Sequence, residues 1–281
     1  MDNSINIIAE IGWNFMGDIE LAKKMIVEAK KSGANIAKFQ FWSPKKLKPG
    51  PWDNDGRREI YNKAALDFEK INLLNNFCKD NDIGSLYSVF TLSDAKEILK
   101  IDNRWIKIPS HEVANLDLIT FCGSNFETIF LSTGACAKYE LEKSIEILKS
   151  VKANFIIMHC VSSYPCEDKN LNLPRMEWLK NFGFPIGLSD HTIGTNIAPT
   201  SVVLGVRAIE KHFTINKKLK KSADHWLSIS PKELSELRNK CDEILASIGK
   251  NKKIVLNCET KTRKLARRSI VAKLPIAKGE K

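Results

Sequence analysis

The sequence lacks the motifs that most directly fix a function class. Its seven cysteines form no Cys-x-x-Cys pair and no zinc-finger spacing, so neither a redox dithiol nor a structural zinc site is expected. There is no Walker loop and no G-x-G-x-x-G fingerprint, so a nucleotide cofactor is not indicated. Because the number of cysteines is odd, we expect reduced thiols and treat the cysteines as core residues.

Long apolar runs are missing as well. No run reaches the roughly 18 residues that a bilayer crossing needs, and residues 1–11 lack the features of a signal peptide. We therefore expect a soluble, cytoplasmic protein that does not bind membranes. The chain has 281 residues, 43% of them hydrophobic, and a formal net charge of +11. This composition fits one large globular domain and favours anionic partners, whether phosphorylated metabolites, nucleic acid or an acidic surface.

Short β-branched runs alternate with longer amphipathic stretches along most of the chain. Eight such pairs over roughly 250 residues predict an α/β fold, the TIM (β/α)8 barrel, because an open doubly wound sheet usually has fewer strands. The predicted strands are Ile5–Ile11, Asn35–Phe41, Ile83–Ser88, Trp105–Ile108, Thr128–Leu131, Phe155–His159, Pro185–Leu188 and Val206–His212. The predicted helices are Ile19–Ser32, Ala65–Asn81, Ser93–Ile101, Asn115–Cys122, Lys138–Val151, Pro174–Phe182, Asn196–Leu204 and Pro231–Gly249.

Two segments fall outside this alternation. Residues 43–64 form a connection rich in proline, glycine and charge, which is either a lid on the active face or a solvated loop with Trp52 buried. Residues 251–281 are basic and show little helical period, which is more typical of a solvated linker than of a nucleic-acid-binding arm. The predicted domains are therefore 1–250 and 251–281.

Polar side chains follow every predicted strand. In a TIM barrel the C-terminal ends of the strands meet at the active face, so we expect these side chains to ring one pocket. His191 and His212 end neighbouring strands and, with Asp224 nearby, suit a divalent ion such as Mn²⁺, although a histidine at a strand end is more often merely hydrogen-bonded. Lys38 and Lys107, with several serines, form a cationic concavity suited to phosphate plus carboxylate.

These motifs together resemble the sialic acid synthase family, TIM-barrel enzymes that condense phosphoenolpyruvate with an amino-sugar aldehyde. The resemblance is carried by Ala-Glu-Ile-Gly at 9–12, Lys-Phe-Gln at 38–40, Lys-Ile-Pro-Ser at 107–110, Leu-Ser-Thr-Gly at 131–134, Ser-Asp-His-Thr at 189–192 and Glu-Lys-His-Phe-Thr at 210–214. The motifs run in order from about residue 5 to residue 230. So long a collinear set is highly specific.

The resemblance implies a role for each motif residue. His191 and His212 would hold the metal, Mn²⁺ with Mg²⁺ or Co²⁺ as alternatives, which acts as a Lewis acid on the aldehyde. Phosphate would leave by C–O cleavage to give a nonulosonic-type 2-keto acid, and our own inference, beyond the resemblance, is that Glu10 and Glu210 manage the protons of that step. The implied phosphoenolpyruvate-binding residues are Lys38, Ser88, Lys107, Ser110, Ser132, Ser162 and Ser189. The implied acceptor-binding residues are Gln40, Glu112, Tyr164 and Asp224.

The chain also departs from the family pattern. Phe15 and Met16 replace a polar pair, and His111 replaces a glycine, so the sequence does not specify the acceptor sugar. Residues 251–281 reach only the start of the antifreeze-like domain, which in family homodimers covers the partner's active site. We therefore expect a homodimer with a more open acceptor site and weaker or altered sugar binding.

Two other functions remain open from the sequence. A metal-dependent sugar isomerase or hydrolase could use the same barrel and the same histidine pair. A basic protein that binds nucleic acid or an acidic glycan would use the basic segment after residue 250. Few aromatic residues are interleaved with the cations there, so we expect no nucleic-acid partner.

Overall fold

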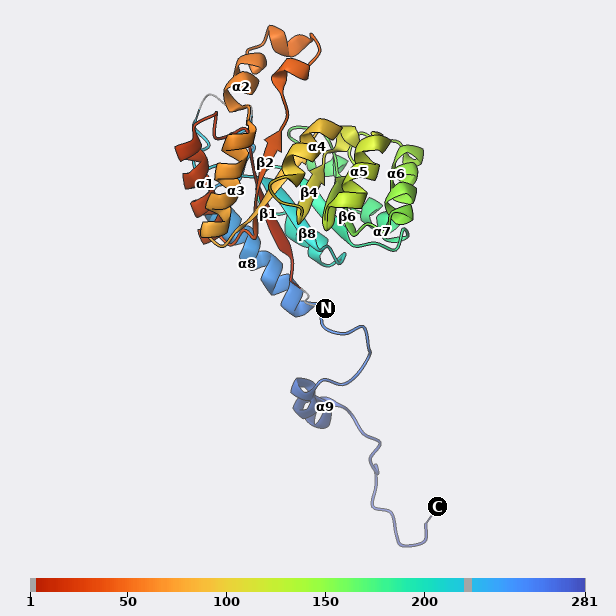
Figure 1. Cartoon of the computed structure of the whole chain (residues 1–281). Helices are drawn as coiled ribbons and strands as arrows, with labels where there is room; N and C mark the ends of the chain where they lie inside the picture. The colour runs from red at the N-terminus through yellow and green to blue at the C-terminus, as the bar shows by residue number, and fades with distance from the viewer. Residues whose placement is uncertain (1–3, 220–223, 281) are drawn as a thin grey trace. The chain divides into compact units, whose positions relative to one another are not determined.

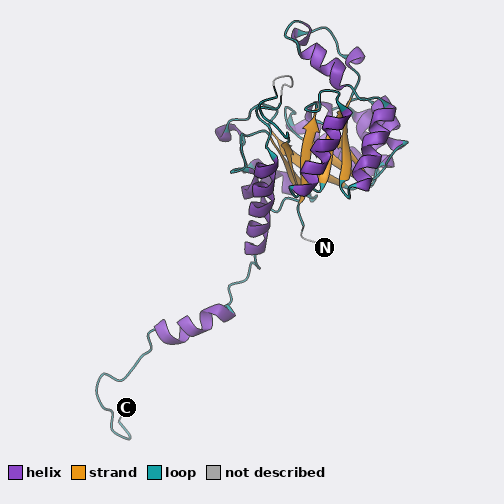
Figure 2. Cartoon of the chain, turned by 90° about the vertical axis from the view of Figure 1, so that its left-hand side faces the viewer, coloured by secondary structure: helices purple, strands orange, loops and turns teal. Residues whose placement is uncertain are grey.

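The computed structural model describes residues 4–219 and 224–280. Its eight strands form a closed barrel in chain order, and every strand is parallel to both neighbours. The strands are β1 (Asn6–Gly12), β2 (Ile36–Phe41), β3 (Gly84–Val89), β4 (Trp105–Ile108), β5 (Thr128–Ser132), β6 (Phe155–Cys160), β7 (Ile186–Asp190) and β8 (Ala208–His212). Figure 2 shows the strands at the centre with helices around them. The predicted TIM barrel is confirmed.

Most of the helices follow the strands as the periodicity predicts. They are α1 (Ile19–Lys31), α2 (Arg57–Ala64), α3 (Phe68–Asp80), α4 (Leu92–Leu99), α5 (Leu116–Asn125), α6 (Lys138–Ser150), α7 (Arg175–Lys180), α8 (Pro231–Ser247) and α9 (Thr260–Ala266). The helix predicted at 196–204 is wrong, because the segment forms only a short 3₁₀ helix, Ala198–Val202. Pro199 lacks a backbone donor there, and Gly205 turns the chain away with a φ of +79°.

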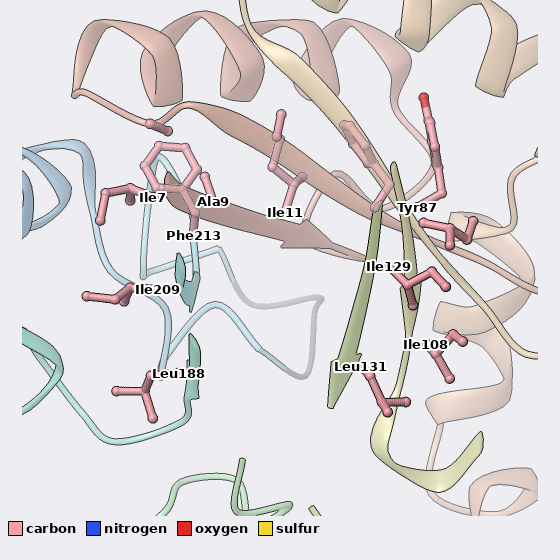
Figure 3. Close-up of a cluster of buried hydrophobic side chains, with 14 of the residues drawn as sticks. Ile7, Ala9, Ile11, Tyr87, Ile108, Ile129, Leu131, Leu188, Ile209 and Phe213 are labelled. Carbon is pink, nitrogen blue, oxygen red and sulfur yellow. The ribbon is translucent and has the colours of Figure 1, made fainter. Parts of the chain in front are cut away.

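Alternation along the strands sorts their side chains into two faces. Figure 3 shows side chains such as Ile7, Ala9 and Ile11 in the large cluster between strands and helices. The residues between them in sequence point into the barrel. Those nearer the strand starts form a second apolar cluster, which consists of Ile8, Ile36, Leu86, Phe130, Ile156, Met158 and Ala208. We call this cluster the barrel plug, and it closes the interior below the C-terminal strand ends.

Residues 43–64, which we call the lid, are folded rather than structureless. They contain two 3₁₀ helices and α2, and they form the orange projection above the barrel in Figure 1. Arg58 donates to the carbonyl of Pro44 at 2.8 Å and so links the two ends of the lid. Lys46 bonds to Ser93 Oγ at 2.8 Å and Asp94 Oδ1 at 3.0 Å. The lid is therefore fastened to the start of α4.

The chain divides into two compact units, Met1–Ser247 and Ile248–Lys281. In the second unit, residues 248–280 are all exposed. They include α9, a helix that the sequence reading did not predict because its seven residues offer too short a periodic pattern. Across residues 4–219 and 224–280, no helix combines the length and the apolar character needed to cross a membrane.

Gly17 fixes the contact between the β1–α1 loop and the lid. It has a φ of +80°, and a β-carbon there would clash with the main-chain carbonyl of Lys63 at the end of α2. Gly56 has a similar φ of +85° but open space around it. We predict that Gly17→Ala lowers the free energy of unfolding by about 3 kcal/mol, from strain plus the clash. Gly56→Ala should lower it by about 1 kcal/mol, from strain alone.

Urea denaturation of the two variants beside the wild type measures this difference. Equal losses in both variants would contradict a close packing of the lid against the β1–α1 loop.

Candidate active site

A cavity of about 750 Å³ opens at the C-terminal ends of the strands. Its size is typical of a site for small metabolites. Every site residue predicted from the sequence lines it, namely Glu10, Lys38, Gln40, Ser88, Lys107, Ser110, Glu112, Ser132, Ser162, Tyr164, Ser189, His191, Glu210, His212 and Asp224. The geometric expectation of one shared pocket therefore holds, while the role of each residue stays a prediction.

The floor of the cavity is a layer of buried charges directly above the barrel plug. Lys38 Nζ lies 2.8 Å from Glu10 Oε2 and 3.6 Å from Glu210 Oε1. Lys107 Nζ lies 2.8 Å from Glu210 Oε2, and Ser189 donates to Glu210 Oε1 at 2.9 Å. We call Glu10, Lys38, Lys107 and Glu210 the charged floor. Two cations and two anions balance within it, which limits the cost of burying each charge.

The two carboxylates of the charged floor differ in acidity. Burial, together with the neighbouring charge of Glu210, raises the pKa of Glu10 despite the opposing effect of Lys38. Burial also acts on Glu210, but the ammonium groups of Lys107 and Lys38 outweigh it and hold the pKa of Glu210 below its ordinary value. Glu10 is thus the carboxylate that takes up a proton more readily, and Glu210 the one that stays ionised.

Hydroxyl groups surround the two lysines. Ser88 accepts a hydrogen bond from Lys38 Nζ at 3.0 Å, and Ser110 accepts one from the Gly134 amide at 3.0 Å. The buried Ser132 Oγ has no hydrogen-bond partner in the part of the chain that the structure describes. A β-carbon on Gly134 would collide with the hydroxyls of Ser110 and Ser162, so glycine lets this hydroxyl group close around one point. The arrangement can bind an anion with several oxygens.

His191 and His212 lie beside the charged floor with ring centroids 5.5 Å apart. His191 Nδ1 is 2.8 Å from the carbonyl of Val161, which assigns the proton to Nδ1 and leaves Nε2 as a lone-pair donor. Burial lowers the pKa of His212 to about 4, so its ring is neutral, the state in which imidazole binds metals. His212 Nδ1 is buried and has no hydrogen-bond partner among the described residues.

The two imidazoles therefore fit a divalent ion that keeps open positions for substrate oxygens. A complete protein cage is absent, since no group of three or more His, Cys, Asp or Glu residues among 4–219 and 224–280 is arranged to hold an ion. The nearest carboxylate to His212 is Asp224, with Oδ2 at 3.6 Å from Nδ1. Tyr164 packs against His191 with ring centroids 4.1 Å apart and restricts the orientation of that ring.

A buried ion pair lies behind the histidines. Lys211 Nζ is 2.9 Å from Asp190 Oδ2, and both side chains are at most 2% exposed. Asp190 also accepts from the Thr192 amide at 2.9 Å. Since Asp190 and Lys211 directly precede His191 and His212, the pair joins the ends of β7 and β8 and fixes the separation of the two rings.

Sequence reasoning missed several lining residues. Treating all cysteines as core is wrong for Cys258, which is exposed. Cys160 is buried as expected, but it also lines the cavity, with Sγ 3.9 Å from His191 Nδ1. The alternation of side chains along β6 could have identified Cys160 as a lining residue. Cys160 follows the inward-facing Met158 by two positions, so both side chains point into the barrel. His159 points the other way, with Nε2 2.7 Å from the carbonyl of Leu171. The aromatic side chains of Trp13, Trp42, Tyr61 and Phe90, also in the lining, were not predicted at all.

A family model described as the NeuB family matches residues 25–253. The chain belongs to the NeuB family. This assignment confirms the resemblance to sialic acid synthases. Among NeuB relatives, the N,N'-diacetyllegionaminic acid synthase of Campylobacter jejuni is 34% identical, over 98% of this chain and 86% of that protein. A pseudaminic acid synthase of the same species is 30% identical, over 99% of this chain and 84% of that protein.

A solved structure supports the same family assignment. The N-acetylneuraminic acid synthetase of Leptospira borgpetersenii, determined in complex with citrate, superposes on this NeuB family chain with a TM-score of 0.86. It is 31% identical in sequence, and the match covers 95% of this chain and 94% of that one.

The Asp190–Lys211 pair generates a stability prediction. Lys211→Met leaves Asp190 as an uncompensated buried charge, so the free energy of unfolding should fall by about 3 kcal/mol. Adding Asp190→Asn keeps an acceptor for Thr192 and removes the charge, so the double variant should recover most of that loss. Urea denaturation of both variants measures the difference. A double variant as unstable as Lys211→Met would show that charge burial is not the cause.

His225 generates a prediction about pH. Its ring is 1% exposed and bonds to Thr214 through Nδ1 at 2.8 Å, and burial lowers its pKa to about 4 from an ordinary 6.5. As the pH falls, His225 is therefore protonated in the unfolded chain before it is protonated in the folded one. The contribution of neutral His225 to the free energy of unfolding is complete above about pH 6.5 and is lost as the pH falls toward 4. We predict that in His225→Gln the free energy of unfolding falls less on acidification, by about 1–2 kcal/mol less at pH 5 than in the wild type.

The measurement is urea denaturation of wild type and His225→Gln at pH 7 and pH 5. Parallel pH dependence in the two proteins would exclude His225 as a source of the acid sensitivity.

Proposed function

We propose that this chain condenses phosphoenolpyruvate with an amino-sugar aldehyde to form a nonulosonic-type 2-keto acid and phosphate. The observation that carries the proposal is the charged, hydroxyl-lined floor beside a pair of histidine rings in a single cavity. The named products of the NeuB relatives, legionaminic, pseudaminic and sialic acids, support the nonulosonic class. We expect the enzyme to be cytoplasmic and homodimeric.

In this proposal the charged floor binds phosphoenolpyruvate. Lys38 and Lys107 neutralise its phosphate and carboxylate, with hydrogen bonds from Ser88, Ser110, Ser132, Ser162 and Ser189. Because the charges of the floor balance one another, an incoming anion adds negative charge beside Glu10. The raised pKa of Glu10 lets it take up a proton at that moment, which frees Lys38 for the substrate.

His191 and His212 would hold the divalent ion, Mn²⁺ with Mg²⁺ or Co²⁺ as alternatives. When bound, the ion supplies Lewis acidity that polarises the aldehyde oxygen of the acceptor. Cys160 and Tyr164 enclose His191 and restrict its orientation. Ring orientation matters because a small misplacement of a ligand weakens both metal affinity and reactivity.

The remaining polar residues orient the acceptor and move protons. Gln40, Glu112, Tyr164 and Asp224 supply donors and acceptors for the sugar hydroxyl and amide groups. After C3 of phosphoenolpyruvate attacks the aldehyde carbon, water adds at C2 and phosphate leaves by C–O cleavage. Glu10 is the proton carrier in this sequence, and Glu210 remains ionised, which holds Lys107 and Ser189 in place.

We predict phosphate release from phosphoenolpyruvate that requires Mn²⁺ and an amino-sugar aldehyde. His191→Ala and His212→Ala should each lower turnover roughly a thousandfold, because they remove several kcal/mol of transition-state stabilisation. Calorimetric titration with Mn²⁺ should show a weakened metal affinity in both variants, and circular dichroism should show an intact fold.

Full activity after strict chelation would contradict the role of the ion. Turnover of a sugar without consumption of phosphoenolpyruvate would favour the isomerase or hydrolase alternative.

A further inference from the structure

Residues 161–174, which connect β6 to α7 and which we call the β6–α7 loop, are held to the barrel at few points. Within this range only Cys166 and Leu171 are buried, while residues 162–164 and 167–170 are exposed. The loop nevertheless carries Ser162 and Tyr164, two of the residues that line the cavity. With so few buried side chains, the loop needs specific bonds to hold these two residues in place.

Three hydrogen bonds contribute this support. The Cys166 amide donates to the carbonyl of His191 at 2.9 Å, and His191 Nδ1 lies 2.8 Å from the carbonyl of Val161. The third bond joins His159 Nε2 to the carbonyl of Leu171 at 2.7 Å. The first two bonds fasten the outgoing part of the loop to the residue that follows β7, and the third fastens the returning part of the loop to β6.

The ring of His159 is committed to the bond with Leu171. His159 is fully buried on the face of β6 that points away from the barrel interior, and burial lowers its pKa, so the ring is neutral and carries one proton. The acceptor carbonyl of Leu171 assigns that proton to Nε2. Nδ1 is buried and has no hydrogen-bond partner in the part of the chain that the structure describes. Among the described residues, Leu171 is therefore the polar contact that accounts for a histidine at this position.

The β6–α7 loop in turn contacts both rings of the histidine pair. The ring centroid of Tyr164 lies 4.1 Å from that of His191 and 5.7 Å from that of His212, edge-on to the second ring. Tyr164 is 52% exposed, so its position depends mainly on the backbone of the loop. A displacement of the loop at Leu171 would therefore reach His191 by two routes, through the Tyr164 ring and through the backbone bond of Cys166.

Building on the proposed function, we infer that His159 is a positioning residue for the histidine pair. The Nε2–H bond to Leu171 fixes the return of the β6–α7 loop, and the loop fixes Tyr164 and the backbone contacts of His191. His159 is not among the residues that line the cavity, so it acts through the loop and not on a ligand. Removal of an outer partner that orients a metal-binding histidine typically lowers metal affinity by roughly 10- to 100-fold.

Three substitutions of His159 separate the hydrogen bond from the volume of the ring. His159→Gln keeps an N–H near the position of Nε2 and should retain the bond. His159→Leu fills much of the same space without a donor, and the shorter side chain of His159→Asn places its amide near the position of Nδ1, away from Leu171. Tyr87→Phe is the matched control, because Tyr87 is also buried and donates to the carbonyl of Ile71 at 3.2 Å, between β3 and α3.

Hydrogen–deuterium exchange of the metal-free protein measures the loop, and calorimetric titration with Mn²⁺ alone measures the histidine pair. In His159→Leu and His159→Asn, the amides of 161–174 should exchange about tenfold faster, because one hydrogen bond stabilises the closed loop by about that factor. The Kd for Mn²⁺ should rise by about tenfold in the same two variants. His159→Gln and Tyr87→Phe should resemble the wild type in both measurements. Circular dichroism checks the fold, and His159→Asn carries the test if His159→Leu does not fold.

Two results would overturn the inference and leave the proposed function standing. One is an unchanged Mn²⁺ affinity, or an unchanged exchange of residues 161–174, in a folded His159→Leu or His159→Asn protein. The other is a loss in His159→Gln as large as that in His159→Leu, which would show that the ring and not the Nε2 bond is required. A wild type that binds no Mn²⁺ would overturn the proposed function, and the role assigned to His159 with it.

Discussion

The structure depends on a balanced set of charges buried inside a closed barrel. Glu10, Lys38, Lys107 and Glu210 come from four different strands and meet above the barrel plug. None of these charges could be buried alone at an acceptable cost, but Glu10 pairs with Lys38 on the neighbouring strand and Lys107 pairs with Glu210 across the barrel. The same register that closes the barrel therefore satisfies the charges and assembles the charged floor. The fold and the site are consequences of one set of strand pairings.

Much of this arrangement could be predicted from the sequence. The alternation of side chains along a strand and the direction of the strand are both determined within one short segment of the chain. Apolar residues at alternate positions predict the strands, and the polar residue at each strand end predicts the active face. Pairing across the barrel is not local. Which carboxylate meets Lys107, and why Glu10 and Glu210 differ in pKa, depends on the stagger of β1, β4 and β8, and no single segment of the sequence encodes that stagger.

The lid shows a different limit of sequence reasoning. Its composition fits either a solvated loop or a cover, and the choice depends on contacts outside the lid, such as the bond of Lys46 to Ser93 at the start of α4. Tyr61 joins Trp13 and Trp42 only because α2 of the lid docks on the β1–α1 loop at Gly17. The cluster of Trp13, Trp42, Tyr61 and Phe90 is assembled from three separate connections, which leaves no pattern in any one of them, so it was not predictable from the sequence.

Strands and connections thus position different parts of the cavity lining. The charged floor and the histidine pair are held by strand ends, where neighbouring backbones fix each side chain to a narrow range of positions. The aromatic side chains of Trp13, Trp42, Tyr61 and Phe90 lie on connections, which can change in length and composition while the barrel register stays constant. The barrel register thus fixes the charged floor and the histidine pair, whereas the lid and its neighbouring loops fix the aromatic part of the lining.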